Sequence, residues 1–306
     1  MKVLVTGASG LIGTALVSHM AAHGDKVLRL VRRAQPNRPD EIVWDPASRK
    51  LDGEQLEGMD AVVHLAGENI ASGRWTAVRK RRILESRIEG TRLLARRLAA
   101  LHKPPQVMIS ASGVAIYGDR GNEILTEESG SGSGFLADVC RQWEREATAL
   151  DEGPVRLILL RMGMILSSEG GALARMLPPF RFGVGGRLGA GKQYMSWIAL
   201  DDLVDVIRFA IDSPSLHGAV NAVAPAPVTN QEFTRALGNV LKRPTLFSVP
   251  SFAVRFLFGE MGQELLLSSI RVVPGRLLAS GFRFRFPEIE AALLHTTSKR
   301  SIEPLI

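Results

Sequence analysis

The sequence contains only one cysteine, Cys140, among its 306 residues. A single cysteine excludes an intramolecular disulfide and any metal site built from several cysteines, and it suits a reducing compartment. The chain also lacks an apolar run that approaches the roughly 18 to 20 residues needed to cross a bilayer, and its first residues do not resemble a signal peptide. These absences predict a cytoplasmic protein with no bound metal and no membrane partner.

Acidic residues are outnumbered: 38 Lys and Arg stand against 31 Asp and Glu, which gives a net charge of +7 and a pI near 10.0. Most of the basic residues are scattered arginines. The one cluster, residues 79–82, lies inside residues 74–102, whose apolar spacing predicts a helix. Because a basic run of this kind is usually a solvated helix face, we expect no nucleic-acid partner, and the excess positive charge favours a small anionic substrate.

Three glycines follow the first apolar run of the chain. Residues 2–5 are rich in β-branched side chains and predict a buried parallel strand, whereas residues 11–23 place apolar residues at helical spacing. Glycines in a strand-to-helix turn let a pyrophosphate approach the backbone N–H groups at the helix N-terminus. An ordinary glycine-rich turn is the alternative. The context predicts a dinucleotide-binding loop that comprises Thr6, Gly7, Ser9, Gly10, Leu11, Ile12 and Gly13.

Strands and helices alternate over the first half of the chain. Further strands are expected at residues 26–31, 41–44, 60–67, 106–110 and 155–160. This order predicts an α/β protein with a Rossmann-type doubly wound parallel sheet and a smaller C-terminal α/β substrate lobe. We expect an NADP-binding domain over residues 1–165 and a substrate lobe over residues 166–306, interleaved with the first domain near residues 195–225.

The residues at the ends of two predicted strands indicate which cofactor binds and where it lies. Arg32 and Arg33 follow the second strand, where an acidic residue would accept from a ribose hydroxyl and an arginine can pair with a 2′-phosphate. They favour NADP over NAD, unless they are simply exposed arginines. The strand at residues 60–67 should pass beneath the cofactor at its end, which comprises Leu65, Ala66, Gly67 and Glu68, while His64 inside it is expected to be structural.

Hydroxyl groups gather where the strand at residues 106–110 ends. Ser110 and Ser112 stand at its carboxyl end, and Tyr117 follows shortly after. Ligands of open α/β sheets bind outside the carboxyl ends of the strands, so we expect substrate chemistry here. Ser112 is the first candidate partner of the reacting oxygen and Ser110 is the next, and Ser110 is also placed with the cofactor contacts.

Residues 6–13 have the spacing Gly-x-x-Gly-x-x-Gly and resemble the fingerprint of the extended short-chain dehydrogenase/reductase superfamily, which includes nucleotide-sugar epimerases. Other stretches resemble one epimerase-family branch, the NADP-dependent nucleoside-diphosphate-sugar epimerase-like proteins. They lie at residues 65–70, 86–87, 134–144, 161–166, 176–186, 196–202, 221–230, 259–261 and 271–274. The resemblance covers nearly the whole chain. It implies NADP(H) as cofactor, with contacts from the glycine loop, Arg32, Leu65, Ala66, Arg87 and Ile165.

The chain departs from the superfamily at the pair Tyr-x-x-x-Lys, in which the tyrosine acts as acid and base and the lysine lowers its pKa. Aligned through Glu144, the chain has Leu136 and Cys140 at these positions. Neither can donate a proton as a phenol or an ammonium does. The missing acid or base would be Tyr117, a water or a group of the substrate.

Two functions remain open from the sequence. The first is an NADP(H)-dependent oxidoreductase or epimerase that acts on a small, anionic or nucleotide-linked substrate, with Ser112 and Tyr117 as its catalytic candidates. The second is an NADP(H)-binding regulator or sensor without turnover, which the absent Tyr-x-x-x-Lys pair favours. The sequence leaves the substrate and the oligomeric state undetermined.

Four expectations concern the C-terminal lobe. The glycine-rich loops of residues 170–197, with Trp197 and several arginines, are expected either to wrap a phosphorylated substrate or to form a mobile surface loop. Asp201 and Asp202 are expected to cap a helix, and Asn230 another. The alternation of aromatic and basic residues at 280–286 predicts an edge strand.

Overall fold

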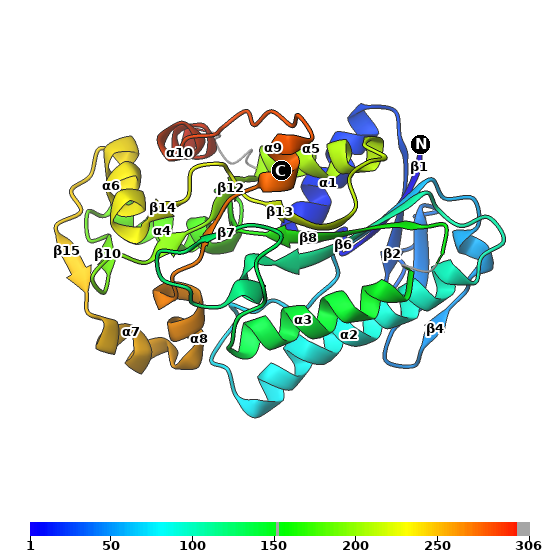
Figure 1. Ribbon diagram of the computed structural model, residues 1–306, viewed down its shortest axis with the longest axis horizontal. Coiled ribbons are helices and arrows are strands. Elements are labelled where there is room, and N and C mark those ends of the chain that lie inside the picture. The colour runs from blue at the N-terminus through cyan, green and yellow to red at the C-terminus, as the bar shows by residue number, and fades with distance from the viewer. Residues whose placement is uncertain (151–152, 299–306) are drawn as a thin grey trace. The chain divides into compact units, whose positions relative to one another are not determined.

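The computed structural model describes residues 1–150 and 153–298 (Figure 1). The chain divides into two compact units. Unit 1 comprises residues 1–116, 137–161 and 204–220, and unit 2 comprises residues 117–136, 162–203 and the remainder from residue 221. Residues 117–136 thus belong to unit 2, although the sequence analysis placed them in the first domain. Residues 204–220 belong to unit 1 and lie within the region near residues 195–225 where interleaving was expected. Within the described ranges, no helix combines the length and apolar content needed to cross a bilayer.

Unit 1 is built on a sheet of eight strands in the order β13-β8-β6-β5-β1-β2-β3-β4. The pairs of β1 with β2 and β5, of β2 with β3 and of β5 with β6 are parallel, and β3 with β4 is antiparallel. The strand bounds are β1 Lys2–Thr6, β2 Lys26–Val31, β3 Glu41–Asp45, β4 Lys50–Leu51, β5 Ala61–His64, β6 Val107–Gly113, β8 Arg156–Met162 and β13 Gly218–Ala222. The predicted Rossmann-type parallel sheet is confirmed.

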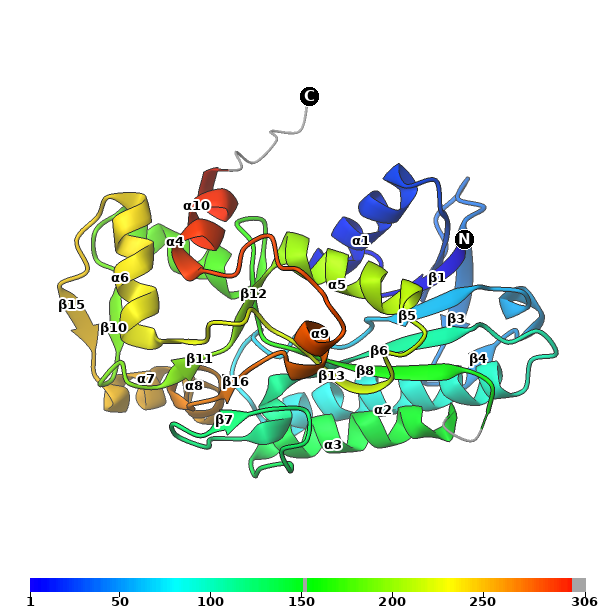
Figure 2. The same ribbon diagram turned by 45° about the horizontal axis from the view of Figure 1, so that its top comes forward.

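Helices cover both faces of this sheet, as the continuous apolar strands require. In Figure 2, α1 and α5 lie on one face and α2 and α3 on the other. Their bounds are α1 Leu11–Ala22, α2 Ala77–Ala99, α3 Phe135–Ala147 and α5 Leu200–Asp212, with short 3-10 turns at η1 Glu54–Leu56, η2 Val114–Tyr117 and η3 Thr148–Leu150. Strand residues such as Leu4, Val62 and Met108 are fully buried in the resulting core.

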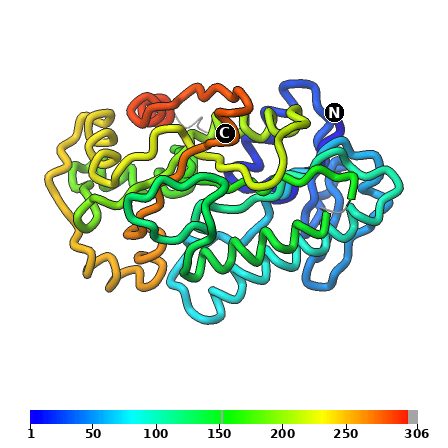
Figure 3. Tube along the Cα trace, in the orientation of Figure 1, coloured from blue at the N-terminus to red at the C-terminus, as the bar shows by residue number. Residues whose placement is uncertain are grey.

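Unit 2 consists of short helices and two-stranded pairings, whose chain path can be followed in Figure 3. Its helices are α4 Gly171–Arg181, α6 Asn230–Leu241, α7 Ser251–Phe258, α8 Glu260–Gly262, α9 Gly275–Ala279 and α10 Ile289–Ser298, with a π-helical turn at η4 Gln263–Leu267. Its paired strands are β9 Met164–Leu166 with β12 Trp197–Ala199, β10 Gly186–Leu188 with β15 Phe247–Val249, β11 Tyr194–Met195 with β14 Val228–Thr229, and β7 Ile124–Leu125 with β16 Arg271–Val272. Trp197, Phe180 and Phe233 are buried in its core.

Two expectations for the C-terminal lobe are corrected by buried polar contacts. No strand forms at residues 280–286. Instead, the backbone N–H groups of Arg285 and Phe286 donate to the carboxylate of Asp202 at 2.7 and 3.1 Å, which draws this segment away from strand pairing. Asp202 itself lies in the first turn of α5 and is completely buried. Its carboxylate therefore holds a neighbouring segment.

The cap of α6 is also one residue earlier than expected. Thr229 is the N-cap: its hydroxyl accepts from the backbone N–H of Glu232, whose carboxylate accepts from the backbone N–H of Thr229. This reciprocal arrangement is a capping box, which satisfies two N–H groups at once. Asn230 is buried, and its side-chain oxygen accepts from the backbone N–H of Leu188 at 2.8 Å.

Candidate functional site

The glycine turn between β1 and α1 is shaped by close approaches of backbone to backbone. Gly7 has a φ of +67°, and a Cβ on this residue would lie 2.9 Å from the carbonyl carbon of Leu65. A Cβ on Gly13 would lie only 2.2 Å from the carbonyl oxygen of Gly7. Side chains cannot be fitted at such distances, so both positions require glycine. The turn is therefore held against the end of β5.

The N-terminus of α1 is suited to an anion. Gly10 is its N-cap, a residue with no side chain to satisfy the first N–H groups, and the first turn has no acidic residue. Unsatisfied N–H groups and the helix dipole together attract a phosphate. Ser9 and Gly10 are exposed, and Leu11 and Ile12 are half-buried, so a ligand can reach this end of the helix.

Thr6, predicted to contact the cofactor, is completely buried and holds the neighbouring strand. Its hydroxyl oxygen accepts from the backbone N–H groups of Leu65 and Ala66, each at 3.0 Å. Both lone pairs are thereby used, so the hydroxyl donates to Nδ1 of His64, 2.7 Å away. The side chain of Thr6 thus fixes the end of β5, along which the cofactor is predicted to lie.

His64 is structural, as the sequence predicts. Because its Nδ1 accepts from Thr6, the neutral ring carries its proton on Nε2, which lies 2.9 Å from the hydroxyl oxygen of Thr91. The same oxygen accepts from the indole N–H of Trp143 at 2.8 Å. Complete burial lowers the pKa of His64 to about 4, so the ring is neutral near pH 7. The network ties β1, β5, α2 and α3 together.

Arg87 is a half-buried arginine next to the end of β5. It donates to the carbonyl oxygens of Glu68 and Ile83, each at 3.0 Å, and lies 4.9 Å from the ring centre of Trp143. Burial lowers its pKa. Among the residues that the structure describes, no carboxylate lies within ion-pair distance of Arg87. A half-buried cation with no carboxylate at ion-pair distance among the described residues is a fitting neighbour for a pyrophosphate.

The other predicted cofactor contacts in this region differ in whether their charged groups are already engaged by other residues of the protein. The carboxylate of Glu68 is engaged by Arg79 at 2.6 Å, and its backbone N–H donates to the hydroxyl of Ser86 at 3.1 Å. Arg32 and Arg33 are exposed beyond the end of β2. In the part of the chain that the structure describes, neither forms an ion pair. Both guanidinium groups are thus available to a 2′-phosphate.

Ser110 has a completely buried hydroxyl with no hydrogen-bond partner among the described residues. It lies in β6, in register with His64 of β5. A buried hydroxyl without a partner is costly, and a bound group that supplies one removes the cost. Together with the α1 N-terminus and Arg87, Ser110 fits a dinucleotide placed across the carboxyl ends of β1, β5 and β6.

Ser112 belongs to a buried ionic cluster that the sequence analysis did not predict. Its hydroxyl donates to Oε1 of Glu144 at 2.6 Å, and Arg161 binds both carboxylate oxygens of Glu144 at 2.9 and 2.8 Å. Three elements, β6, α3 and β8, are joined by this cluster. Because the hydrogen of Ser112 is held by Glu144, Ser112 presents acceptor lone pairs to any ligand. The signals available in the sequence were an arginine at the end of a predicted strand and a glutamate on the helix that precedes this strand.

In α3, the residues at the positions of the superfamily's tyrosine and lysine cannot take over the roles of that pair. Leu136 and Cys140, at the tyrosine and lysine positions, are both nearly fully buried. Burial, followed by the nearby carboxylate of Glu144, raises the pKa of the Cys140 thiol to about 11. The thiol is therefore neutral near pH 7, and neither residue supplies an ionisable group for proton transfer.

Two predicted site residues lie in unit 2. Tyr117 is completely buried, and its hydroxyl donates to Oδ1 of Asn221 at 2.7 Å. The amide of Asn221 also donates to the carbonyl oxygen of Val273 at 3.1 Å, so Tyr117 is part of a structural network. Ile165 is half-buried in β9, where it pairs with Ile198 of β12.

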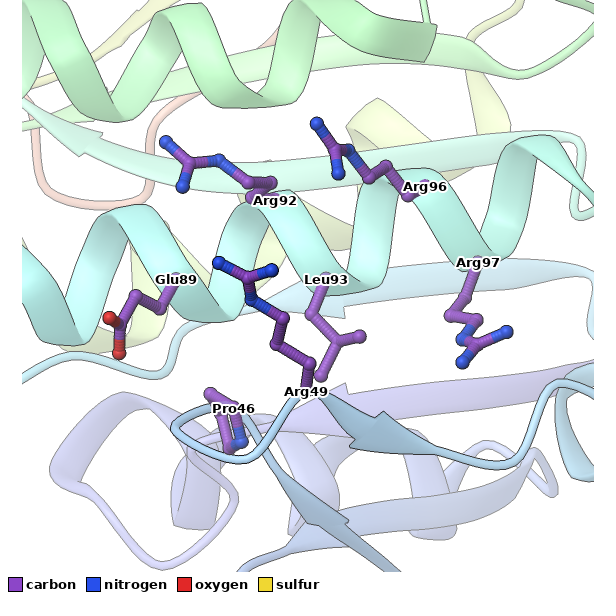
Figure 4. Close-up of a pocket in the computed structure, with 7 residues that line it drawn as sticks. All are labelled: Pro46, Arg49, Glu89, Arg92, Leu93, Arg96 and Arg97. Carbon is purple, nitrogen blue, oxygen red and sulfur yellow. The ribbon is translucent and has the colours of Figure 1, made fainter.

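A basic pocket of about 280 Å³ lies on unit 1, between α2 and the turn that follows β3 (Figure 4). Its lining comprises Pro46, Arg49, Glu89, Arg92, Leu93, Arg96 and Arg97. None of these is a predicted cofactor contact. Arg92 is already engaged by both carboxylate oxygens of Glu146, at 2.7 and 2.6 Å. The pocket is therefore separate from the residues considered above.

A further pocket, of about 390 Å³, lies within unit 2. Gly189 and Lys192 from the predicted substrate loops line it, together with Asp119, Arg255 and Ser269 among others. Trp197, assigned to the same loops from the sequence, is instead fully buried, and its indole N–H donates to the carbonyl oxygen of Ala226 at 3.0 Å. That residue is a core side chain of unit 2, which corrects the expectation.

Comparisons with known proteins agree with this geometry. Residues 3–222 match the model of the NAD dependent epimerase/dehydratase family, and residues 249–296 match a domain of unknown function, DUF1731. Epimerase family protein Mb2239 of Mycobacterium bovis is 43% identical over 297 residues, which are 97% of this chain and 98% of that protein. The resemblance recognised in the sequence is thereby confirmed.

Solved structures give the same result. The crystal structure of human epimerase family protein SDR39U1 with NADPH has a TM-score of 0.90 and 36% identity, and the match covers 98% of this chain and 100% of that one. The nucleoside-diphosphate sugar epimerase from Corynebacterium glutamicum has a TM-score of 0.78 and 36% identity, over 97% of this chain and 58% of that one.

Proposed function

The chain belongs to the NAD dependent epimerase/dehydratase family, and from this membership we propose that it is an NADP(H)-dependent oxidoreductase or epimerase. The observation that carries the proposal is a set of ligand-accepting groups in unit 1. It comprises the uncapped N–H groups at the start of α1, the guanidinium of Arg87, which has backbone carbonyl partners but no carboxylate at ion-pair distance among the described residues, and the unpartnered hydroxyl of Ser110. Each lies at or next to the carboxyl end of a parallel strand, where nucleotide cofactors of open α/β sheets bind.

NADP(H) is the cofactor that both the sequence and the family support. A relative of 36% identity, human SDR39U1, was crystallised with NADPH. In this chain, Arg32 and Arg33 would hold the 2′-phosphate, Arg87 and the glycine turn the pyrophosphate, and Ser110 a neighbouring polar group. Bound NADP(H) supplies or accepts a hydride. The protein's own contribution is to position the two reactants and to provide a route for the proton.

Ser112 is the proposed partner of the reacting oxygen. Its lone pairs can accept a hydrogen bond from a substrate hydroxyl, because its own hydrogen is held by Glu144 at 2.6 Å. This polarity suits a substrate that enters as an alcohol. Tyr117 remains an untested second candidate, and its full burial and its bond to Asn221 give it the weaker support. The substrate is proposed to be small and anionic, with nucleotide-linked sugars as the first class to test.

A second function has support from α3. The positions of the usual tyrosine and lysine are occupied by buried Leu136 and by Cys140, whose thiol is neutral near pH 7. A protein with this arrangement can bind NADP(H) and act as a regulator or sensor without turnover. The two functions share the cofactor and differ in whether a hydride is ever transferred.

One experiment separates these functions. Purified protein is titrated with NADPH and with NADH while nicotinamide fluorescence is recorded, and carbonyl compounds and nucleotide sugars are then added while the nicotinamide absorbance is followed. NADPH binding with oxidation by a panel member establishes the oxidoreductase. Nucleotide sugars are also assayed with NADP+ for cofactor reduction and for epimerised product, because a substrate that enters as an alcohol needs the oxidised cofactor, which an epimerase then regenerates. Tight binding without any of these changes supports the sensor. Failure to bind NADPH contradicts both.

A further inference from the structure

Unit 2 exposes several large aromatic and aliphatic side chains. Five large apolar side chains, here called the apolar edge, have exposed fractions of 58 to 87%: Phe182 84%, Leu246 87%, Phe247 58%, Phe252 73% and Phe256 80%. Scattered exposed apolar residues are normal, but a contiguous group of this kind usually marks a surface that is covered by something else.

The segments that carry the apolar edge are neighbours in unit 2. β10 pairs with β15, with Gly186 opposite Phe247. A Cβ on Gly183, next to Phe182, would lie 3.8 Å from the ring of Pro244, which leads into Leu246 and Phe247. β15 then continues through Pro250, the N-cap of α7, and both views show this strand leading into that helix (Figures 1 and 2).

The helix α7 presents its aromatic residues outward because its inner face is anchored elsewhere. Val254 is buried, and a Cβ on Gly262 would lie 2.9 Å from its carbonyl oxygen, so this side of α7 is packed against α8. Phe252 and Phe256 are four residues apart and therefore share one face of the helix. Arg255, which is exposed, lies beside them.

The charge around the apolar edge is predominantly positive. Residues 179–188 and 241–260 contain one acidic residue, Glu260, and five basic residues: Arg181, Arg187, Lys242, Arg243 and Arg255. All five are exposed. Aromatic and aliphatic side chains rimmed by lysine and arginine are the composition of surfaces that lie in the interface of an anionic membrane.

We propose that the apolar edge of unit 2 binds reversibly to the surface of an anionic membrane, with the aromatic residues at the acyl boundary and the basic residues among the headgroups. A second copy of the chain is disfavoured as the occupant, because a symmetric contact would bring five positive charges against five more. The proposed contact is interfacial and needs no spanning helix. It replaces the expectation, drawn from the absence of apolar runs, that the protein has no membrane partner.

The test is sedimentation of the full chain with vesicles at low salt. One set of vesicles contains phosphatidylcholine alone, and the other contains phosphatidylcholine with about a third of phosphatidylglycerol. We expect the protein to pellet with the anionic vesicles only, and to be released as the salt concentration rises, because the electrostatic part of the attraction is screened. A protein that stays in the supernatant with anionic vesicles overturns the proposal.

Paired variants separate the apolar and basic contributions. Phe252→Ser/Phe256→Ser should weaken partitioning about tenfold or more, since each phenyl group loses its buried apolar contact. Val78→Ser/Leu294→Ser, which removes exposed apolar residues elsewhere, should not. Arg181→Gln/Arg187→Gln should reduce the salt-sensitive part, whereas Arg81→Gln/Arg145→Gln, with the same change in net charge, should leave it nearly intact. Equal effects from test and control variants contradict the proposal.

Light scattering of the vesicle-free protein tests the competing occupant. A monomer is expected, with or without the two serine substitutions in α7. A dimer that the Phe252→Ser/Phe256→Ser variant dissociates would show that a second copy covers the apolar edge, and would overturn the membrane proposal. Thermal unfolding of each variant confirms that the measured changes do not come from loss of folded protein.

Discussion

The guanidinium carbon of Arg87 lies 3.2 Å from the position that a Cβ would take on Gly67. The glycine therefore leaves space for the half-buried side chain of Arg87 next to the end of β5. Because Arg87 has backbone carbonyl partners but, among the described residues, no carboxylate at ion-pair distance, its charge is compensated only in part. A pyrophosphate along the same strand end would complete the compensation.

Replacement of Arg87 by methionine tests this role. Arg87→Met keeps an unbranched side chain against Trp143 and removes the charge. We expect NADPH and NADH to bind about tenfold more weakly, or worse, because a hydrogen bond to a charged group contributes roughly 1.5 to 3 kcal/mol. The measurement is a fluorescence titration with each cofactor. Unchanged affinity for both would contradict a pyrophosphate contact, and a thermal melt serves as the control for folding.

The pair Arg32 and Arg33 should behave differently from Arg87. They are exposed, and the 2′-phosphate is the only group by which NADPH differs from NADH. Arg32→Ala/Arg33→Ala should therefore weaken the binding of NADPH by roughly tenfold or more while leaving the binding of NADH nearly unchanged. The ratio of the two dissociation constants is the quantity to measure. If the affinities for both cofactors fall equally, the assignment of these arginines to the 2′-phosphate is wrong.

Ser112 and Ser110 make a matched pair on β6. Ser112→Ala should abolish turnover of any substrate that is found, with NADPH affinity nearly unchanged, because Arg161 still compensates Glu144. Ser110→Ala should instead change cofactor affinity, because its buried hydroxyl has no partner among the described residues. The readouts are kcat and the NADPH dissociation constant. Full activity in Ser112→Ala would make that serine structural.

Local sequence patterns were sufficient for the strand, turn and helix of residues 2–22, because a short apolar run, three glycines and a helical period lie next to one another. A local pattern, the alternation of aromatic and basic residues, also predicted a strand at residues 280–286, and this prediction was wrong. There the backbone N–H groups of Arg285 and Phe286 are satisfied by Asp202, more than eighty residues earlier. Alternation alone cannot show where such a partner lies.

The candidate site shows the same limit. The glycine turn and the end of β5 could be located from spacing, since backbone geometry governs them. The cluster of Ser112, Glu144 and Arg161 could not, because its members come from β6, α3 and β8 and meet only when the sheet and the helix are assembled. The role of Thr6 likewise depended on two N–H groups contributed by a different strand.

Cys140 should be unreactive in the folded protein. Burial and Glu144 raise the pKa of its thiol to about 11, so about one molecule in a thousand is the nucleophilic thiolate at pH 8. We expect Ellman's reagent to label the native protein far more slowly than the protein in denaturant, where the thiol has its ordinary pKa. Rapid, complete labelling of folded protein at pH 8 would contradict this environment.

The lowered pKa of His64 should make the stability of the protein depend on pH. Its pKa is about 4 when folded, and about 6.5 is usual for an exposed histidine, so between these values the unfolded chain binds more protons than the folded one. The free energy of unfolding should therefore fall as the pH drops through this window, and the contribution of His64 at pH 5 is a loss of about 2 kcal/mol.

Urea unfolding at pH 7.5 and pH 5 gives the size of this loss, and His217→Asn, which removes an exposed histidine, provides the control. His64→Asn should reduce the difference between the two pH values, whereas the control should leave it nearly unchanged. Because the substitution at His64 also disturbs the bonds to Thr6 and Thr91, the wild-type protein offers an independent measurement. In its NMR titration the ring of His64 should stay neutral at pH 5, with the proton on Nε2. A ring that titrates near pH 6.5 would show that it is not held buried between these two hydroxyls.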